Sequence, residues 1–476
     1  MEKSIPAAGR LLNDKWWVRW IALILIASMM FFGYMFVDVM SPLQSLVQNQ
    51  LGWSPEAFGY YAGAEYMLNV FGFLIVAGII LDKMGVRFTG TLSASVMFIG
   101  ACVKLYAISD LFAGTAFEQW LSSWWVEMPG SAKLAAFGFT IFGCGCEMAG
   151  ITVSKAIAKW FKGKEMALAM GVEMAIARLG VFAVLSLSPR VADWMGGNNP
   201  SVVAPVAFCT VLLLIGLISY SVFTIMDTRL DRQTQSGDEE GEEEFKLSDV
   251  KNLLTSRLFW IIALLCVLYY SAIFPFQRFG TNMLQCNLHI SETEAADLLR
   301  WFPIGALCLT PVLGILLDKV GRGATMLILG SLLLIGCHLV FALWLPANPS
   351  KVLALATIII LGVSFSLVPA ALWPSVPKVM DARYLGSAYS LIFWVQNIGL
   401  FGIPILFGRI LETSNPGVTD PTQYDYTNPM LMFAGLGILA FICAVWLKML
   451  NTRNHYGLED PNILADDEAV RLDGEA

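Results

Sequence analysis

One ten-residue stretch occurs twice in the chain, as GIILDKMGVR at 78–87 and as GILLDKVGRG at 314–323. Both copies contain Gly, three apolar residues, Asp, Lys, one apolar residue and Gly in the same order. This order predicts a helix that ends near the Asp, a tight turn at the second Gly and basic groups at the level of the lipid headgroups. The usual excess of Lys and Arg in short cytoplasmic loops explains the basic residues alone, but it leaves the spacing of Gly and Asp unexplained.

The composition of the chain is that of a membrane protein. Of its 476 residues, 57% are hydrophobic and 14% are charged, whereas soluble domains usually contain about 45–50% and about 25%. So few charges cannot cover the surface of a soluble protein, which excludes a soluble enzyme and a nucleic-acid-binding protein. The net charge of −7 indicates no basic partner, because most of the acidic excess lies in two segments outside the apolar runs.

Twelve apolar runs reach the length of about 20 residues that a helix needs to cross a membrane. They are 18–41, 56–80, 88–107, 131–158, 165–188, 201–226, 258–282, 296–317, 323–345, 351–374, 383–408 and 427–450. Lys and Arg gather in alternate loops between these runs, which predicts that both termini face the cytoplasm. The expected organisation is an N-terminal six-helix bundle (1–226), an acidic cytoplasmic linker (227–257), a C-terminal six-helix bundle (258–453) and an acidic, unstructured cytoplasmic tail (454–476).

The repeated stretch resembles the signature loop of the major facilitator superfamily, and the resemblance extends over all twelve runs. It implies an all-α polytopic membrane protein with two six-helix bundles and a central site near the midplane. In this superfamily the loop Asp and its basic neighbours hold the cytoplasmic gate closed. The gating residues that the resemblance implies are Asp82, Lys83, Arg87, Asp318, Lys319 and Arg322. The second copy matches less well, because its Arg stands one position closer to the turn Gly than Arg87 does.

Two opposite charges are expected near the middle of the membrane. Ionisable residues within spans are costly and are therefore functional candidates. At about 1.5 Å per residue, Glu147 and Arg178 lie about 18 and 20 Å from the cytoplasmic ends of consecutive antiparallel spans. Either they form a permanent ion pair, or both face a cavity in which Arg178 binds the carboxylate and Glu147 the ammonium group of a zwitterion. We favour the cavity, because a buried ion pair often stabilises a protein no more than apolar packing does.

The same depth estimate selects polar and aromatic residues in the second half. Tyr270 and Asn397 lie about 20 Å from the cytoplasmic ends of their spans, and Gln396 and Trp373 are near them in sequence. We expect these four residues to contribute to the substrate site, although ordinary packing between helices is an equally open interpretation of each.

Other charged residues in the spans are expected to lie toward the outer side. Glu65 is interpreted as an acid of the outer vestibule, with a proton site as the alternative. Lys104, Arg278 and Arg300 fall near outer span ends, where long basic side chains usually extend to the interface.

Several longer strings resemble one branch of the superfamily, the lysosomal dipeptide transporters. They are WFKGKEMALAMGVEMAIARLG (160–180), CVLYYSAIFPF (266–276), ALWPSV (371–376) and GSAYSLIFWVQNIGL (386–400). The resemblance implies facilitated passage of dipeptides, with the matching Glu147 and Arg178 binding the two termini of the substrate.

The function predicted for the chain is secondary transport of dipeptides or similar small zwitterions by alternating access. No Walker motif and no catalytic triad is recognisable, so no enzymatic activity is expected. No cofactor is expected either, and the nine Cys and three His residues form no metal-ligand pattern. The alternatives are an organic or inorganic anion porter that uses Arg178 as its ligand and Glu147 as proton carrier, and a receptor or scaffold that has lost transport.

The expected partners are a small-molecule substrate and the lipid bilayer, with no nucleic acid. The protein is expected to work as a monomer, and the need for an accessory subunit stays open. The acidic dileucine signal typical of the lysosomal branch is missing, because Ala7 stands where the acid should precede Leu11 and Leu12. No glycosylation sequon is usable, so the cell (inner) membrane is expected rather than the lysosome.

Overall fold

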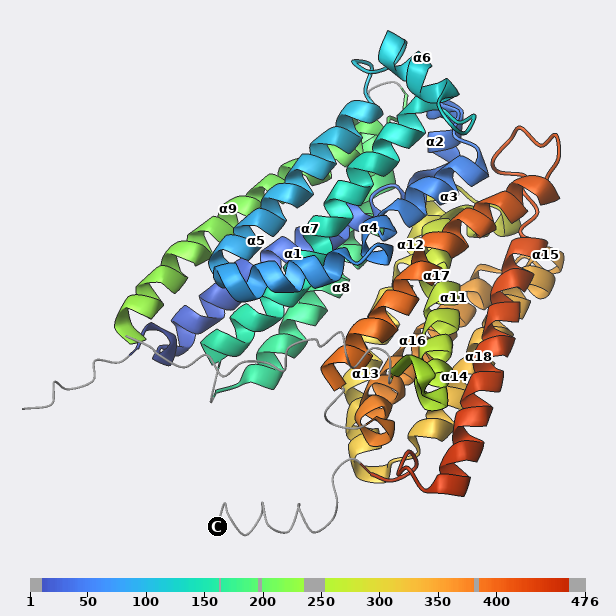
Figure 1. The fold of residues 1–476 in the computed structure, drawn as a ribbon. Helices are drawn as coiled ribbons and strands as arrows, with labels where there is room; N and C mark the ends of the chain where they lie inside the picture. Colours follow the sequence, from blue (N-terminus) through green and yellow to red (C-terminus); the bar gives the residue numbers. More distant parts are fainter. Residues whose placement is uncertain (1–10, 162–163, 196–198, 235–252, 381–384, 462–476) are drawn as a thin grey trace, which may run out of the picture.

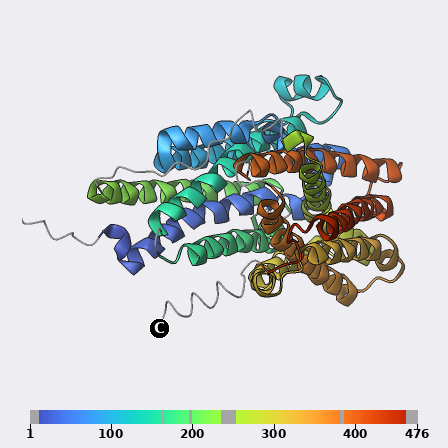
Figure 2. The same ribbon diagram turned by 60° about the horizontal axis from the view of Figure 1, so that its bottom comes forward.

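The structure is a computed structural model in which residues 11–161, 164–195, 199–234, 253–380 and 385–461 are described, and these residues form an all-helical fold (Figures 1 and 2). The helices of the first half are α1 (Trp16–Asp38), α2 (Gln44–Leu51), α3 (Pro55–Ala64), α4 (Met67–Val70), α5 (Phe73–Ala107), α6 (Ala116–Ser123), α7 (Gly130–Phe161), α8 (Met166–Met195) and α9 (Val203–Thr234). Those of the second half are α11 (Arg257–Leu288), α12 (Glu292–Leu299), α13 (Trp301–Val320), α14 (Gly323–Leu339), α15 (Leu345–Ala347), α16 (Lys351–Val379), α17 (Leu385–Ser414) and α18 (Thr427–Asn454). The predicted all-α polytopic fold is confirmed.

The described residues contain 11 helices that are long and apolar enough to span a membrane, against the twelve expected, and the difference arises between residues 55 and 107. The expected span 56–80 is not one helix, since it is divided into α3, α4 and the first part of α5. Gly72 has a φ of 88° between α4 and α5, a conformation that glycine adopts at little cost. The expected span 88–107 follows Gly85 (φ 72°) within α5, so two passes join without a loop.

The neighbouring helix α7 stabilises the break between α3 and α5 through two contacts. The hydroxyl of Thr140 donates a hydrogen bond of 2.9 Å to the carbonyl oxygen of Ala64, which the helix no longer pairs. Gly143 lies so close to Glu65 that a Cβ there would overlap the Glu65 carbonyl oxygen. The missing side chain at Gly143 therefore lets α7 pack directly against the break that carries Glu65.

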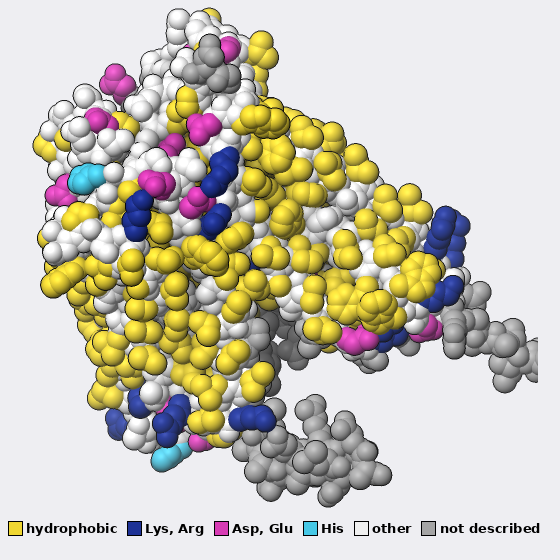
Figure 3. Space-filling model, turned by 180° about the vertical axis from the view of Figure 1, so that it is seen from behind, with side chains coloured by type: hydrophobic (Ala, Val, Ile, Leu, Met, Phe, Trp, Pro, Cys, Tyr) yellow, Lys and Arg dark blue, Asp and Glu magenta, His cyan; other side chains and the backbone are white. Residues whose placement is uncertain are grey.

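The two halves of the molecule touch at their outer ends and diverge toward the cytoplasmic ends (Figures 1 and 3). Helices α3 and α4 pack against α17, and α8 packs against α12 and α13. Polar contacts reinforce this meeting: Arg190 pairs with Asp297 at 2.6 Å, and Ser45 donates to Gln285 at 2.7 Å. With the ends rich in Lys and Arg taken as cytoplasmic, as the sequence predicts, the conformation is closed on the outer side.

The C-terminal tail departs from the expectation that it is unstructured from residue 454. Residues 455–461 pack against the cytoplasmic end of the second half, where Leu458 is only 1% exposed. Lys378 donates hydrogen bonds to the carbonyl oxygens of Gly457 and Asp460. The acidic composition of the tail predicts no packing, but the apolar side chain of Leu458 is buried against the bundle. The rest of the tail and the glutamate run of the expected linker lie outside the described residues.

Candidate functional site

A cavity of about 230 Å³ lies between the two halves, at the level where they meet. Both halves contribute to its lining. Its charged residues are Asp38, Glu65, Glu147, Arg178 and Arg278. Apolar and aromatic side chains, among them Val37, Val181, Phe274, Phe393 and Leu400, complete the walls. Eight of the sixteen lining residues are charged or carry a carboxamide, and such convergent polar groups in an enclosed cavity are typical of a site for a polar small molecule.

Glu147 on α7 and Arg178 on α8 both line this cavity. Both residues are described, and no ion pair joins their side chains. The guanidinium carbon of Arg178 instead lies 5.0 Å from the ring centre of Phe365 on α16, across the interface between the halves. The cation and the acid are thus open to the same cavity without neutralising each other directly.

The residues predicted in the second half occupy two layers. Gln396 and Asn397 on α17 line the cavity. The indole of Trp373 donates a hydrogen bond of 3.3 Å to the Tyr270 hydroxyl, and it stacks on Phe393, which is part of the wall. Tyr270 and Trp373 therefore support the wall from behind.

The side-chain oxygen of Asn397 is buried and has no hydrogen-bond partner in the described part of the chain, whereas its amide nitrogen donates to the Phe393 carbonyl oxygen. A buried acceptor left without a donor is rare in native proteins. Asn397 belongs to the cavity lining, but this oxygen is itself buried beneath the cavity surface, so the side chain must turn before a ligand N–H can reach it.

A buried ion cluster was missed by the sequence analysis. Arg278 of α11 pairs with Asp38 of α1 at 3.1 Å and with Glu65 at 2.6 Å. The three residues are only 6%, 2% and 5% exposed. Arg278 also donates to the carbonyl oxygen of Val37, and Gln277 donates to Asp38. The expectation that Arg278 extends to the interface was wrong, because two acids lie within reach of its guanidinium group. The interpretation of Glu65 as an acid of the outer vestibule was also wrong, since the side chain is buried, whereas its alternative as a proton site stays open.

Lys104 also differs from its expected place at the outer interface. It is 0% exposed, and its ammonium group has no hydrogen-bond partner among the described residues. Its Nζ lies 4.3 to 4.9 Å from the ring centres of Phe36, Tyr61 and Phe139. Three aromatic faces attract this cation from within the first half, which explains its burial.

Arg300 does lie near an outer helix end, as expected. Its guanidinium group donates to Ser186 of α8 at 2.8 Å and pairs with Asp297 at 3.1 Å. It therefore also takes part in the contact between the halves.

The sequence offers a signal for only part of the ion cluster. At about 1.5 Å per residue, Asp38 and Arg278 both lie about 30 Å from the cytoplasmic ends of the runs 18–41 and 258–282, so equal depth pairs them. Glu65 lies about 22 Å from the cytoplasmic end of the run 56–80, nearer to the depth of Glu147, so depth does not place it with them.

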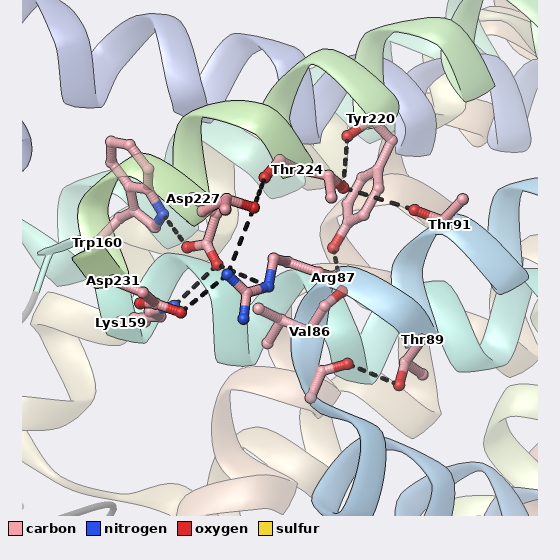
Figure 4. A network of polar contacts seen from close by, with 12 residues as sticks. Val86, Arg87, Thr89, Thr91, Lys159, Trp160, Tyr220, Thr224, Asp227 and Asp231 are labelled. Carbon is pink, nitrogen blue, oxygen red and sulfur yellow. Dashed lines mark hydrogen bonds and ion pairs between the residues drawn. The ribbon is translucent and has the colours of Figure 1, made fainter. Parts of the chain in front are cut away.

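The first copy of the repeated loop is tied to its own bundle by a polar network (Figure 4). Arg87 pairs with Asp231 at 3.1 Å and approaches the fully buried Asp227 of α9 at 3.9 Å. Lys159 of α7 pairs with both acids, at 2.8 Å for Asp227 and 2.7 Å for Asp231. The Trp160 indole donates to Asp227 at 2.8 Å. Asp82 pairs with Lys155 at 2.9 Å, and Lys83 is exposed.

The second copy of the loop contacts the C-terminal tail instead. The backbone N–H of Arg322 donates to the carbonyl oxygen of Glu459 at 2.9 Å. The carboxylate of Glu459 accepts from the Thr325 backbone and hydroxyl. Lys319 is exposed, and the side chain of Asp318 lies outside the described residues.

On the cytoplasmic side, α1 is also held to the loop before α8. Arg19 donates hydrogen bonds to Glu165 at 2.7 and 2.9 Å. These hydrogen bonds hold the pKa of the Glu165 carboxyl below its usual value. Among the described residues no group of His, Cys, Asp or Glu could hold a metal ion.

Comparison with known proteins agrees with this architecture. The chain matches the family described as Major Facilitator Superfamily over residues 26–400 and 279–461. It is 27% identical to the human lysosomal dipeptide transporter MFSD1 over 83% of this chain and 80% of that protein. The protein of the same name from Danio rerio is 29% identical over 83% and 81%. The match to the Gallus gallus protein, at 31% identity, covers 59% of this chain and 63% of that protein.

Solved structures share the fold at low sequence identity. The nucleoside transporter NupG superposes with a TM-score of 0.68 at 14% identity, over 90% of this chain and 99% of that chain. A structure from proton-dependent oligopeptide transporters gives 0.62 at 14% identity, over 91% and 99%. The repeated loop, the two helical bundles and the family match together establish that this chain belongs to the major facilitator superfamily.

Proposed function

We propose that this transporter of the major facilitator superfamily moves dipeptides or similar small zwitterions by alternating access, with Glu147 and Arg178 binding the two ends of the substrate. Secondary transport itself follows from the family, whereas the substrate class and the roles of residues are our inference.

The observation that carries the proposal is the presence of one unneutralised acid and one unneutralised guanidinium on the same cavity. A zwitterion supplies the counter-ion for each. The planar guanidinium of Arg178 suits a carboxylate, because it can donate to both oxygens at once. Its guanidinium carbon lies 5.0 Å from the ring centre of Phe365, a contact that uses none of the acceptors that a carboxylate ligand would supply.

A peptide also needs partners for its amide group. The oxygen of Asn397, a residue of the cavity lining, has no donor among the described residues, and a turn of this side chain toward the cavity would offer it as an acceptor to a peptide N–H. Gln396 lies beside it, with its oxygen accepting from the Cys266 thiol at 3.3 Å. This combination of a terminal clamp and an amide acceptor favours a dipeptide over a simple anion.

The relatives support the same substrate class. The human and Danio rerio proteins carry the name lysosomal dipeptide transporter, and Arg178 lies in the string 160–180 by which this chain resembles that branch. We place this chain in the cell membrane, because the lysosomal sorting signal expected of that branch is missing. By the same family resemblance, Asp82 and Arg87 are proposed to secure the cytoplasmic gate when the bundles close on that side.

Uptake into proteoliposomes tests the proposal. Arg178→Ala and Glu147→Gln are each expected to lower uptake of a radiolabelled dipeptide by about tenfold or more, because truncating one partner of a desolvated charged contact usually costs about 2–5 kcal/mol. Glu173→Gln is the matched control, since Glu173 is an acid of α8 that does not belong to the cavity lining. Normal uptake by both cavity variants would contradict the clamp.

A thermal-shift screen separates the alternatives. A ligand that binds only the folded protein raises its melting temperature. We expect a dipeptide to stabilise the wild-type protein, and its N-acetylated amide, which lacks both charges, to have no effect. Stabilisation by nitrate or dicarboxylates alone would favour the anion porter, and stabilisation by no small solute would favour the scaffold.

A further inference from the structure

The buried ion cluster joins the two halves of the transporter at the outer wall of the cavity. Arg278 belongs to the second half, whereas Asp38 and Glu65 belong to the first. All three residues line the cavity. Because the outer ends must separate during alternating access, opening toward the outside withdraws the guanidinium from both acids.

Both acids depend on one cation of the other half. Asp38 and Glu65 of the first half each pair with the guanidinium of Arg278, and among the described residues no other basic side chain pairs with either acid. Two neighbouring carboxylates that lose a shared cation repel each other, and one of them then usually takes up a proton.

The hydrogen-bond partners show which acid is more affected. Asp38 accepts a hydrogen bond of 2.9 Å from Ser41 of its own half, and this contact survives separation. In the described part of the chain, the Glu65 carboxylate is bound by Arg278 alone. Glu65 therefore loses its entire set of donors when Arg278 leaves.

We propose that Asp38 and Glu65 form a cation site in the transport pathway, which Arg278 fills while the outer gate is closed and in which Glu65 takes a proton when that gate opens. A neutral Glu65 no longer attracts Arg278 as an ion pair, so acidic conditions favour the outward-open state. This site is independent of the substrate assignment, because neither the geometry nor the test below involves a dipeptide.

The surroundings of Glu65 contain groups of both signs. The titratable and charged groups that face it are Asp38 from α1, Tyr61 from α3, Tyr66 next to the break, Lys104 from α5, Cys146 and Glu147 from α7 and Arg278 from α11. The residues that α17 contributes to the cavity lining are uncharged. Among these groups, only Arg278 belongs to the other half, so the movement of the halves changes the field at Glu65 through this one cation.

The native cysteine Cys146 reports on the outer gate, because it lines the cavity and is partly exposed. A membrane-impermeant thiol reagent added outside right-side-out vesicles reaches it only when the outer gate opens. At pH 7.5 inside and outside, we expect Glu65→Gln to raise the labelling rate about tenfold over wild type, which corresponds to about 1.4 kcal/mol. At pH 5.5 the two rates should converge. Because the charge of Glu65 also acts directly on the nearby Cys146 thiol, each rate is divided by the labelling rate of the same protein from the cytoplasmic side of inverted vesicles at the same pH, which corrects for the reactivity of the thiol itself.

Three controls make the result specific. Cys146→Ser identifies the labelling that comes from other cysteines. Asp297→Asn removes the exposed ion pair between Asp297 and Arg190, which also joins the two halves. It should change the labelling rate much less, because exposed ion pairs contribute little free energy to the association of the halves. Arg278→Gln removes the same ion pair with Glu65 by changing its partner in the second half. It should speed labelling at both pH values, and combining it with Glu65→Gln should give no further increase.

The outcomes decide the proposal. Equal labelling of wild type and Glu65→Gln at pH 7.5 would overturn it. A ratio that stays at tenfold at pH 5.5 would also overturn it, because Glu65 would then remain charged in acid. An Arg278→Gln protein that labels no faster than wild type would show that Arg278 does not hold the gate.

Discussion

The guanidinium group of Arg178 contacts an aromatic ring, and among the described residues it forms no ion pair with an acid. Phe365, the ring beneath its guanidinium group, makes edge contacts with Tyr270 and Phe274 at centroid distances of 6.3 and 5.7 Å. These neighbours hold the ring in place, and the contact stabilises the cation without occupying its hydrogen-bond donors. An arginine positioned in this way is prepared to bind a carboxylate.

Replacing Phe365 by Leu should therefore weaken substrate binding without unfolding the protein. A cation–π contact is worth about 0.5–2 kcal/mol, so we expect the KM for dipeptide uptake to rise about twofold to thirtyfold. Phe365→Tyr keeps the ring and should behave nearly as wild type. If the Leu variant kept the wild-type KM, the aromatic support of Arg178 would have no role in binding.

Helix α3 owes its position against α17 to glycine. A Cβ at Gly63 would overlap the carbonyl oxygen of Phe401, and one at Gly59 would overlap that of Pro404. Because both obstacles are backbone atoms, a side-chain rearrangement cannot relieve them. The outer closure of the transporter thus depends on the absence of two side chains in the broken second pass.

The variant Gly63→Ala should accordingly prevent full closure of the outer gate. We expect dipeptide uptake to fall severalfold and Cys146 to be labelled faster from outside, since the helices can no longer meet. Gly402→Ala on α17 is the matched control, because a Cβ at Gly402 has open space around it. Alanine there should retain uptake and, by its higher helix propensity, keep or raise the melting temperature. Wild-type uptake by Gly63→Ala would contradict the close contact.

The molecule is closed outside and spread toward the cytoplasm (Figures 1 and 3). On the cytoplasmic side each copy of the repeated loop is bound within its own half. Arg87 contacts α9, and Arg322 contacts the tail. These contacts hold each bundle as a rigid unit while the bundles stand apart, as alternating access requires.

This arrangement predicts an asymmetry in the access to Cys146. Without substrate, an impermeant thiol reagent should label it faster from the cytoplasmic side, in inverted vesicles, than from the outside. A saturating dipeptide should slow this labelling, because it occupies the same cavity. Faster labelling from the outside in wild-type membranes would mean that a different conformation dominates in the bilayer.

Much of this architecture could be derived from local sequence properties. The length and composition of apolar runs predict the spans, the distribution of Lys and Arg predicts their direction, and the repeated loop predicts two related bundles. These signals are local because each helix must satisfy its backbone hydrogen bonds within itself in a bilayer. The rise per residue also selected Glu147, Arg178 and Asn397, which line one cavity in the structure, whereas Tyr270, selected in the same way, lies behind the cavity wall.

Contacts between distant helices were not accessible in this way. Depth along a span does not specify the direction in which a side chain points, and Arg278 meets Glu65 across 213 positions of sequence. The break after α3 and the glycine contact with α17 likewise follow from how tilted helices pack. The apolar pattern of the chain therefore predicts a carrier with two helical bundles. The closed outer gate and its buried ion cluster form only when the bundles meet, because the guanidinium of Arg278 in the second half finds its acids, Asp38 and Glu65, in the first.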